Sequence, residues 1–187
     1  MAANAHALAR YAALCQEADI VPMVEPEMIM EGTHSVERCY EVTAQVLKVL
    51  FAQLAEQGVA LEGTILKVSM VLPGKACAQQ VSDQVVAEQT VKCLKENVPA
   101  NVAGVVFLSG GQSDSQSTTR LNAMHQLGAL PWPLSFSYGR GIQQPALEAW
   151  AKDRAAFGAA QKVLVHRAHM NGLASEGKYT VEEEAMA

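Results

Sequence analysis

The sequence lacks the features of several protein classes. Its 14 Lys and Arg against 19 Asp and Glu give a net charge of -5, and the basic residues are scattered singly, so no basic stripe is available for nucleic acid or anionic lipid. No apolar run approaches the roughly 18 residues of a membrane span. A charged amino-terminal segment followed by an apolar run, which would mark a signal peptide, is also missing. We therefore expect a cytoplasmic protein with neither nucleic acid nor membrane as partner.

Cysteine is sparse and shows no paired pattern. Cys15, Cys39, Cys77 and Cys93 form no Cys-x-x-Cys motif, and most lie within apolar helical patterns. Such residues are typical of small core side chains in a reducing compartment. The five histidines show no ligand spacing at a shared strand end. We expect neither a disulfide nor a metal site.

The residues that are present predict one α/β domain over residues 1–187. The chain has a mass of 20.0 kDa and is 50% hydrophobic, which suffices for a sizeable core. Strands are predicted at residues 20–27, within 61–74, at 102–108 and at 133–138, and the run at 102–108 is typical of a strand buried on both faces. Helical patterns lie before and between them and over residues 144–156 and 158–171, and residues 173–187 are expected to form a mobile tail. Alternating strands and helices indicate a parallel sheet with crossover helices.

Polar residues fall at corresponding places on these strands. Glu25, Lys67, Ser109 and Ser137 all lie at or just before a predicted strand carboxyl end. In an α/β sheet or barrel, ligands bind at that edge. We therefore expect these side chains to lie around one site.

Lys67 is the only charged residue in the apolar run from Ile65 to Leu72. A desolvated lysine has a lowered pKa, and a neutral amine can attack a carbonyl to form a Schiff base. The alternative is a lysine at a strand end whose stem covers apolar surface while its ammonium stays in water. This stretch alone leaves both interpretations open.

Glu25 and Glu27 are two residues apart on a predicted strand and should share a face. Two nearby carboxylates push their pKa values apart, which suits proton transfer. The alternative is a loop carrying two solvated acids.

Two strand-to-helix turns could bind an anion. Ser109 and Gly110 belong to a Ser-Gly-Gly turn with free backbone N–H groups. Ser137, Gly139 and Arg140 form a second turn, with a guanidinium that can bind phosphate through two hydrogen bonds. Each turn alone could be merely a turn; two in neighbouring units favour a phosphate site.

Four motifs together resemble, in order and at compatible distances, the class I (Schiff-base) fructose-bisphosphate aldolases. They are VEPE at 24–27, LEGTILK at 61–67, FLSGGQS at 107–113 and LSFSYGR at 134–140. The resemblance runs from about residue 4 to 179. It implies the (β/α)8 TIM-barrel family, with this chain covering about strands 5–8, a half barrel, plus a C-terminal helix.

The resemblance also implies roles for the residues. Lys67 matches the Schiff-base lysine and Glu25 the acid/base, with Glu27 beside it. The substrate phosphate would be held by a further set, namely Ser109, Gly110, Ser137, Gly139 and Arg140. The implied reaction is cleavage of fructose 1,6-bisphosphate in glycolysis, with a phosphorylated sugar as substrate and no metal or organic cofactor.

The chain departs from the family pattern in three ways. The family's strand-one aspartate and its strand-three and strand-four lysines have no counterpart, Val68 and Ser69 replace the usual Pro-Asn pair, and the extended tail of animal members is absent. We expect either a homo-oligomer or completion by an N-terminal half. A catalytically inactive half barrel or assembly module, and a different lysine-dependent keto-sugar-phosphate aldolase, are the alternatives.

Overall fold

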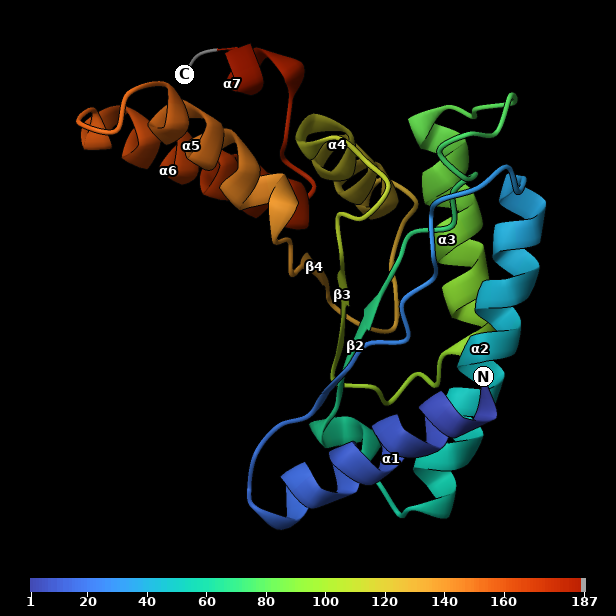
Figure 1. The fold of residues 1–187 in the computed structure, drawn as a ribbon. Coiled ribbons are helices and arrows are strands. Elements are labelled where there is room, and N and C mark those ends of the chain that lie inside the picture. Colours follow the sequence, from blue (N-terminus) through green and yellow to red (C-terminus); the bar gives the residue numbers. More distant parts are fainter. Residues whose placement is uncertain (186–187) are drawn as a thin grey trace.

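Four parallel strands and the helices that connect them form the fold of this computed structural model, which describes residues 1–185 (Figure 1). The elements are α1 (Ala2–Glu17), β1 (Met23–Val24), α2 (Val36–Glu56), the 3-10 helix η1 (Leu61–Gly63), β2 (Ile65–Val68), α3 (Asp83–Asn97), β3 (Gly104–Phe107), α4 (Asp114–His125), β4 (Leu134–Phe136), α5 (Arg140–Lys152), α6 (Phe157–Ser175) and α7 (Val181–Ala185).

The strand order follows the chain order. The sheet runs β1-β2-β3-β4 and every neighbouring pair is parallel. A doubly wound sheet would reverse its strand order at a switch point, and no reversal occurs among these strands. Four consecutive strands joined by helical crossovers are what four successive units of a β/α barrel provide. The predicted parallel α/β architecture is confirmed.

The helices pack against one another in sequence around the sheet. α1 packs on α2, α2 on α3, α3 on α4 and α4 on α6. Figure 1 shows α2 and α3 side by side along the strands, and α5 and α6 paired beyond the strand carboxyl ends. The side chain of Gln16 at the end of α1 hydrogen-bonds to Ala60 and Thr64, just before β2. α1 is thereby attached at the amino-terminal end of the strands.

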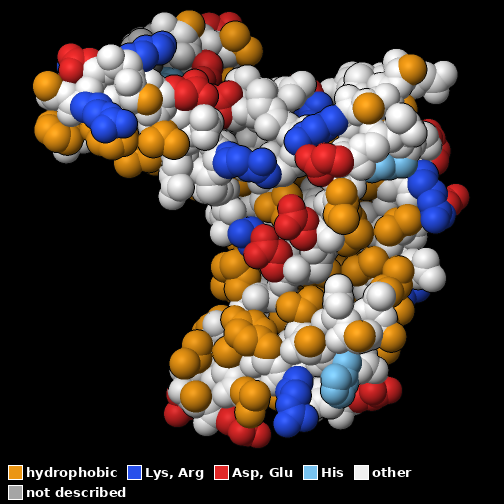
Figure 2. Space-filling view, viewed as in Figure 1, with side chains coloured by type: hydrophobic (Ala, Val, Ile, Leu, Met, Phe, Trp, Pro, Cys, Tyr) orange, Lys and Arg blue, Asp and Glu red, His pale blue; other side chains and the backbone are white. Residues whose placement is uncertain are grey.

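One face of the sheet is covered by helices, and residues 1–185 leave the other face partly exposed. Along β2 and β3, fully buried residues alternate with partly exposed ones: Leu66, Val68, Val105 and Phe107 are buried, whereas Lys67 lies on the opposite, partly exposed face. The prediction that residues 102–108 are buried on both faces is therefore wrong for this chain, because nothing in the described residues covers the second face fully. Figure 2 shows charged side chains gathered in the hollow of the molecule, with hydrophobic side chains prominent below them.

Several predicted boundaries differ from the structure, and three of them have a physical cause. β1 contains only two residues of the predicted 20–27, since Pro22 and Pro26 have no N–H to donate to a neighbouring strand. α5 begins at Arg140 instead of residue 144, so Arg140 lies in its first turn. α6 passes the predicted stop at residue 171 and ends at Ser175, because Asn171 is buried and its amide donates to the carbonyl of Arg167 inside the helix.

The carboxyl-terminal segment makes several contacts. Residues 173–185 include the end of α6 and all of α7. Tyr179 is buried, its backbone N–H donates to Asn122, and Glu184 pairs with Arg167. The mobility expected for residues 173–187 stays a prediction, and residues 186–187 lie outside the described part of the chain.

Two helices, α3 and α4, begin at a serine that caps the first helical turn. Ser82 caps α3 by accepting from the N–H of Val85. Ser113 and Gln116 form a capping box at α4, in which each side chain accepts a hydrogen bond from the other residue's backbone N–H. These caps determine where the loops after β2 and β3 end. The same loops form part of the wall of the site described below.

Leu66→Ala tests the helix-covered core. Leu66 is fully buried in β2, so its truncation should lower the free energy of unfolding by about 2–5 kcal/mol. Leu14→Ala is the matched control because Leu14 is 55% exposed on α1 and should change stability by only about 0.5 kcal/mol or less. Urea unfolding midpoints measure both; equal losses would contradict this account of the core.

Candidate active site

The side chains of Lys67 and Glu25 meet where two adjacent strands end. Lys67 Nζ lies 2.9 Å from Glu25 Oε1, and the two side chains are 18% and 40% exposed. Glu25 follows β1 directly, and β1 pairs with β2 through Val24 and Leu66, so the next residue of each strand falls side by side. A carboxylate at hydrogen-bonding distance from an amine provides a direct route for proton transfer. The side chains of Lys67 and Glu25 are therefore in contact, as expected from their places at neighbouring strand ends.

Glu27 lies near Gly110 and Arg140, two of the residues predicted to bind phosphate. It lines a cavity of about 170 Å³ together with Gly110 and Arg140. Its backbone N–H donates to the carbonyl of Glu25 at 3.1 Å, which tightens the chain just after β1. Glu27 therefore lies beside Gly110, where a Cβ would be 3.5 Å from Glu27 Oε1.

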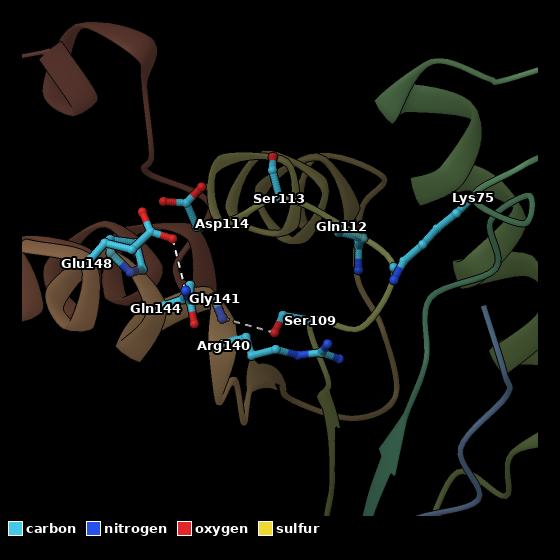
Figure 3. Close-up of a pocket in the computed structure, with 11 residues that line it drawn as sticks. Lys75, Ser109, Gln112, Ser113, Asp114, Arg140, Gly141, Gln144 and Glu148 are labelled. Atoms are coloured by element: carbon cyan, nitrogen blue, oxygen red, sulfur yellow. Dashed lines mark hydrogen bonds between the residues drawn. The ribbon is translucent and has the colours of Figure 1, made fainter. Parts of the chain in front are cut away.

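Ser109 links the loop after β3 to the first turn of α5. Its Oγ accepts a 3.1 Å hydrogen bond from the backbone N–H of Gly141 (Figure 3). A Cβ at Gly141 would lie 3.0 Å from the Cβ of Ser109, so glycine permits this close approach. Arg140 is thereby held beside Ser109.

A larger cavity of about 490 Å³ opens at this junction. Its lining comes from the loops after β2 and β3 and from the starts of α4 and α5: Lys75, Ser109, Gly111, Gln112, Ser113, Asp114, Arg140, Gly141, Gln144, Pro145 and Glu148. Free N–H groups in a first helical turn and a guanidinium favour anions. Phosphate binding by Ser109, Gly110 and Arg140 stays a prediction.

The local backbone requires a glycine at position 111. Its φ of +82° lies in the left-handed region, and a Cβ would lie 2.8 Å from the Cβ of Met30. The loop after β3 thus lies directly against the loop after β1. Gly110, the first of the pair, lines the smaller cavity with Glu27.

Two predicted residues contribute less directly. Ser137 follows β4 and donates its backbone N–H to Phe107 at 2.9 Å, and it lines neither of the two cavities. Gly139 is the N-cap of α5, and its carbonyl accepts from the N–H groups of Ile142 and Gln143. Of the predicted phosphate residues, Ser109, Gly110 and Arg140 therefore gather around the cavities.

The sequence interpretation missed several cavity residues. Gln144 and Glu148 are one turn apart on α5 and joined by a 2.9 Å hydrogen bond. The predicted helix over residues 144–156 already contained both, so their spacing was the signal that could have found them. Lys75 follows Pro73 and Gly74 in the loop after β2. Gln112 belongs to the Ser-Gly-Gly-Gln-Ser motif quoted above. The orientation of its side chain depends on a hydrogen bond from Arg120, which the motif does not predict.

Residues 1–185 show neither a metal-ligand cluster nor a membrane-spanning helix. That stretch contains no group of three or more His, Cys, Asp or Glu side chains arranged to hold a metal ion. None of its helices combines the length and apolar character needed to cross a membrane. The four cysteines are free, two of them buried.

Comparison with known proteins identifies the relatives of the chain. The family model for class I fructose-bisphosphate aldolase matches residues 1–187. A probable fructose-bisphosphate aldolase class 1 of Xanthomonas axonopodis pv. citri is 64% identical over 178 residues, covering 95% of this chain and 53% of the relative. The Dictyostelium discoideum fructose-bisphosphate aldolase is 48% identical over 180 residues, covering 96% of this chain and 50% of that protein.

A solved structure agrees with these relatives. The fructose-bisphosphate aldolase of Plasmodium falciparum, solved with TRAP and a small-molecule inhibitor, matches with a TM-score of 0.91 and 45% identity. The match covers 95% of this chain and 51% of that one, so the predicted TIM-barrel fold is confirmed for about half of a barrel.

The chain spans about half the length of the curated relatives it matches, corresponding to their C-terminal part. The motifs around Glu25, Lys67, Ser109 and Arg140, the parallel half barrel and the match along the whole chain agree with one another. The chain belongs to the class I fructose-bisphosphate aldolase family.

Proposed function

We propose that this chain carries the Schiff-base chemistry of an aldolase that cleaves fructose 1,6-bisphosphate to dihydroxyacetone phosphate and glyceraldehyde 3-phosphate in glycolysis. The observation that carries the proposal is the 2.9 Å contact between Lys67 Nζ and Glu25 at adjacent strand ends, in a chain of this family. A glycolytic substrate favours the cytoplasm as location.

The proposed reaction starts with proton transfer from the Lys67 ammonium. The neutral amine attacks the ketose carbonyl carbon, and the carbinolamine loses water to give an iminium. The C4 hydroxyl gives up its proton, the electron pair of the C3–C4 bond moves toward the iminium to form an enamine, and the aldehyde leaves. Protonation at C3 and hydrolysis then release the ketone and the Lys67 amine, and the route uses no metal or organic cofactor. Glu25 transfers protons during imine formation, and Glu27 adjusts the charge around it.

The proposed phosphate site orients the substrate. In this proposal Ser109, Gly110 and Arg140 hold a substrate phosphate, with Ser137 and Gly139 shaping the turn that presents the guanidinium. Binding energy from a group remote from the reacting carbon places the carbonyl against Lys67. The cavity between α4 and α5 has the room and the donors for this role.

An inactive half barrel is the second candidate function. It is favoured by the open face of the sheet and by the coverage of only about half of each relative. In that case the chain would act as an assembly module, completed by an N-terminal half or by other copies of itself.

Lys67 is expected to form the imine. Borohydride reduction in the presence of dihydroxyacetone phosphate should attach the triose to Lys67, because this lysine is the one paired with Glu25 at a strand end. Peptide mass mapping locates the label, and Lys67→Arg should abolish it. Lys48→Arg, on the exposed side of α2, is the control and should label normally; a label on Lys48 or Lys75 instead would contradict the assignment.

Arg140 is expected to bind phosphate. Inorganic phosphate should raise the melting temperature by mass action on the native state, and Arg140→Ala should remove most of that increase. The ligand-free melting temperature should barely change, because Arg140 is exposed. Arg38→Ala removes an exposed arginine that pairs with Glu41 on α2 and should leave the response intact. The same response in wild type and Arg140→Ala would place the site elsewhere.

The isolated 187-residue chain is expected to self-associate and to turn over fructose 1,6-bisphosphate orders of magnitude more slowly than a complete aldolase. Open strand edges favour association, and losing residues that act as a unit removes several powers of ten in rate. Light scattering and a coupled assay measure both, and co-expression with an N-terminal half from a relative should restore activity. A monodisperse monomer turning over at about 1–1000 per second would contradict this expectation.

A further inference from the structure

The loops after β1 and β2 are joined into one rim beside the larger cavity. The N–H of Lys75 donates to the carbonyl of Met30, and that of Ala76 to Gly32, both at 2.9 Å. A Cβ at Gly74 would lie 2.4 Å from the carbonyl oxygen of Gly32, so only glycine permits this approach. The backbone of Lys75 is therefore held at a fixed position on the cavity wall.

The Lys75 side chain is engaged by an exposed carboxylate. Its Nζ donates to Glu31 Oε1 at 2.8 Å, and the two side chains are 47% and 70% exposed. The hydrogen bond from Lys75 lowers the pKa of Glu31, with a smaller contribution from the charge of Arg140. Glu31 therefore lies within the field of both cations. An ion pair this exposed is weak and is readily exchanged for another anion.

Gln112 lines the same cavity. Its Oε1 accepts from Arg120 Nη1 at 3.0 Å, and Arg120 Nε pairs with Asp83 at 2.6 Å. Because a guanidinium can only donate, this contact fixes the amide with its oxygen toward Arg120. Gln112 Nε2 is then a buried donor that finds no acceptor among residues 1–185. An unmade hydrogen bond of this kind is costly, and an oxyanion in the cavity would satisfy it.

The two acidic side chains of the cavity wall already have partners. Asp114 lies 3.7 Å from the guanidinium of Arg167, and Glu148 accepts from Gln144. Figure 3 shows Lys75 extending from the loop after β2 toward Gln112, across the cavity from α5. The wall formed by Lys75 and Gln112 is therefore the donor-rich side opposite Glu148.

We propose that Lys75 and Gln112 form a further phosphate-binding pair in this cavity, and that Glu31 is a built-in competitor that occupies Lys75 until phosphate replaces it. The ligand class is a phosphate monoester or inorganic phosphate, whose several oxygens can be reached from two walls at once. This inference rests on the proposed phosphate role of Arg140 and adds the opposite wall to it.

Titration calorimetry of the full chain with inorganic phosphate tests the pair. Lys75→Ala should weaken binding about tenfold, as expected for a lost hydrogen bond to a charged group. Gln112→Ala should weaken binding severalfold, and Lys75→Arg should keep most of it. Glu31→Gln should tighten binding severalfold, because it frees Lys75 and removes a negative charge from the rim.

The control is an ion pair of the same kind outside the cavity. Lys178 Nζ contacts Glu176 at 2.7 Å, both side chains are exposed, and neither lines the cavity. Lys178→Ala and Glu176→Gln change the net charge as the test variants do and should leave phosphate affinity unchanged. If Lys178→Ala weakened phosphate binding as much as Lys75→Ala, the loss of affinity would be an effect of net charge, and the proposal would be overturned.

The remaining outcomes separate the two proposals. Weaker binding in Arg140→Ala with no change in Lys75→Ala would overturn the Lys75 pair and keep the Arg140 site. Weaker binding in Lys75→Ala with no change in Arg140→Ala would keep the pair and overturn the Arg140 site. Glu31→Gln stays informative even if Lys75→Ala folds poorly, since unchanged or weaker binding in this variant overturns the proposed competition.

Discussion

The parallel register between β1 and β2 is the constraint on which the site depends. Because Val24 pairs with Leu66, the following residues Glu25 and Lys67 come side by side at the strand ends. A slip of one residue would turn Lys67 to the helix-covered face, where Leu66 and Val68 are fully buried. A charge there would lack both water and its carboxylate, and the cost of burying it would oppose the slip. The ion pair and the apolar core thus select the same register.

The loops at the carboxyl edge of the sheet are attached to one another. Each loop at the carboxyl edge is fixed by a short-range contact with its neighbour: Lys75 with Met30 through backbone hydrogen bonds, Gly111 against Met30 by close packing, and Ser109 with Gly141. Glycine at these contacts permits approaches that any Cβ would prevent. The polar groups are therefore carried by loops that are attached to one another, although each begins on a different strand.

The sequence predicts those features that depend on local chemistry or on the strand-end rule. The Ser82 cap and the Ser113 capping box involve residues three apart, and the meeting of Glu25 with Lys67 follows from parallel strands. The direction of Gln112 could not be predicted, because it depends on Arg120 and, through it, on Asp83, a residue 37 positions away from Arg120. The earlier start of α5 was hidden by Pro145, which suggests a helix start but lies inside the helix.

The chemistry proposed for this chain needs two kinds of surroundings. The amine needs a carboxylate partner and partial shielding, and Lys67 has both from its own and the adjacent strand, since its side chain is only 18% exposed. Orientation and charge stabilisation of a bisphosphate need a closed, water-poor space, because electrostatic interactions strengthen as the local dielectric falls. The alternating burial of β2 and β3 leaves one face of the sheet open within the described residues. In the proposed mechanism, imine formation is therefore local to this chain, whereas efficient cleavage depends on what covers that face.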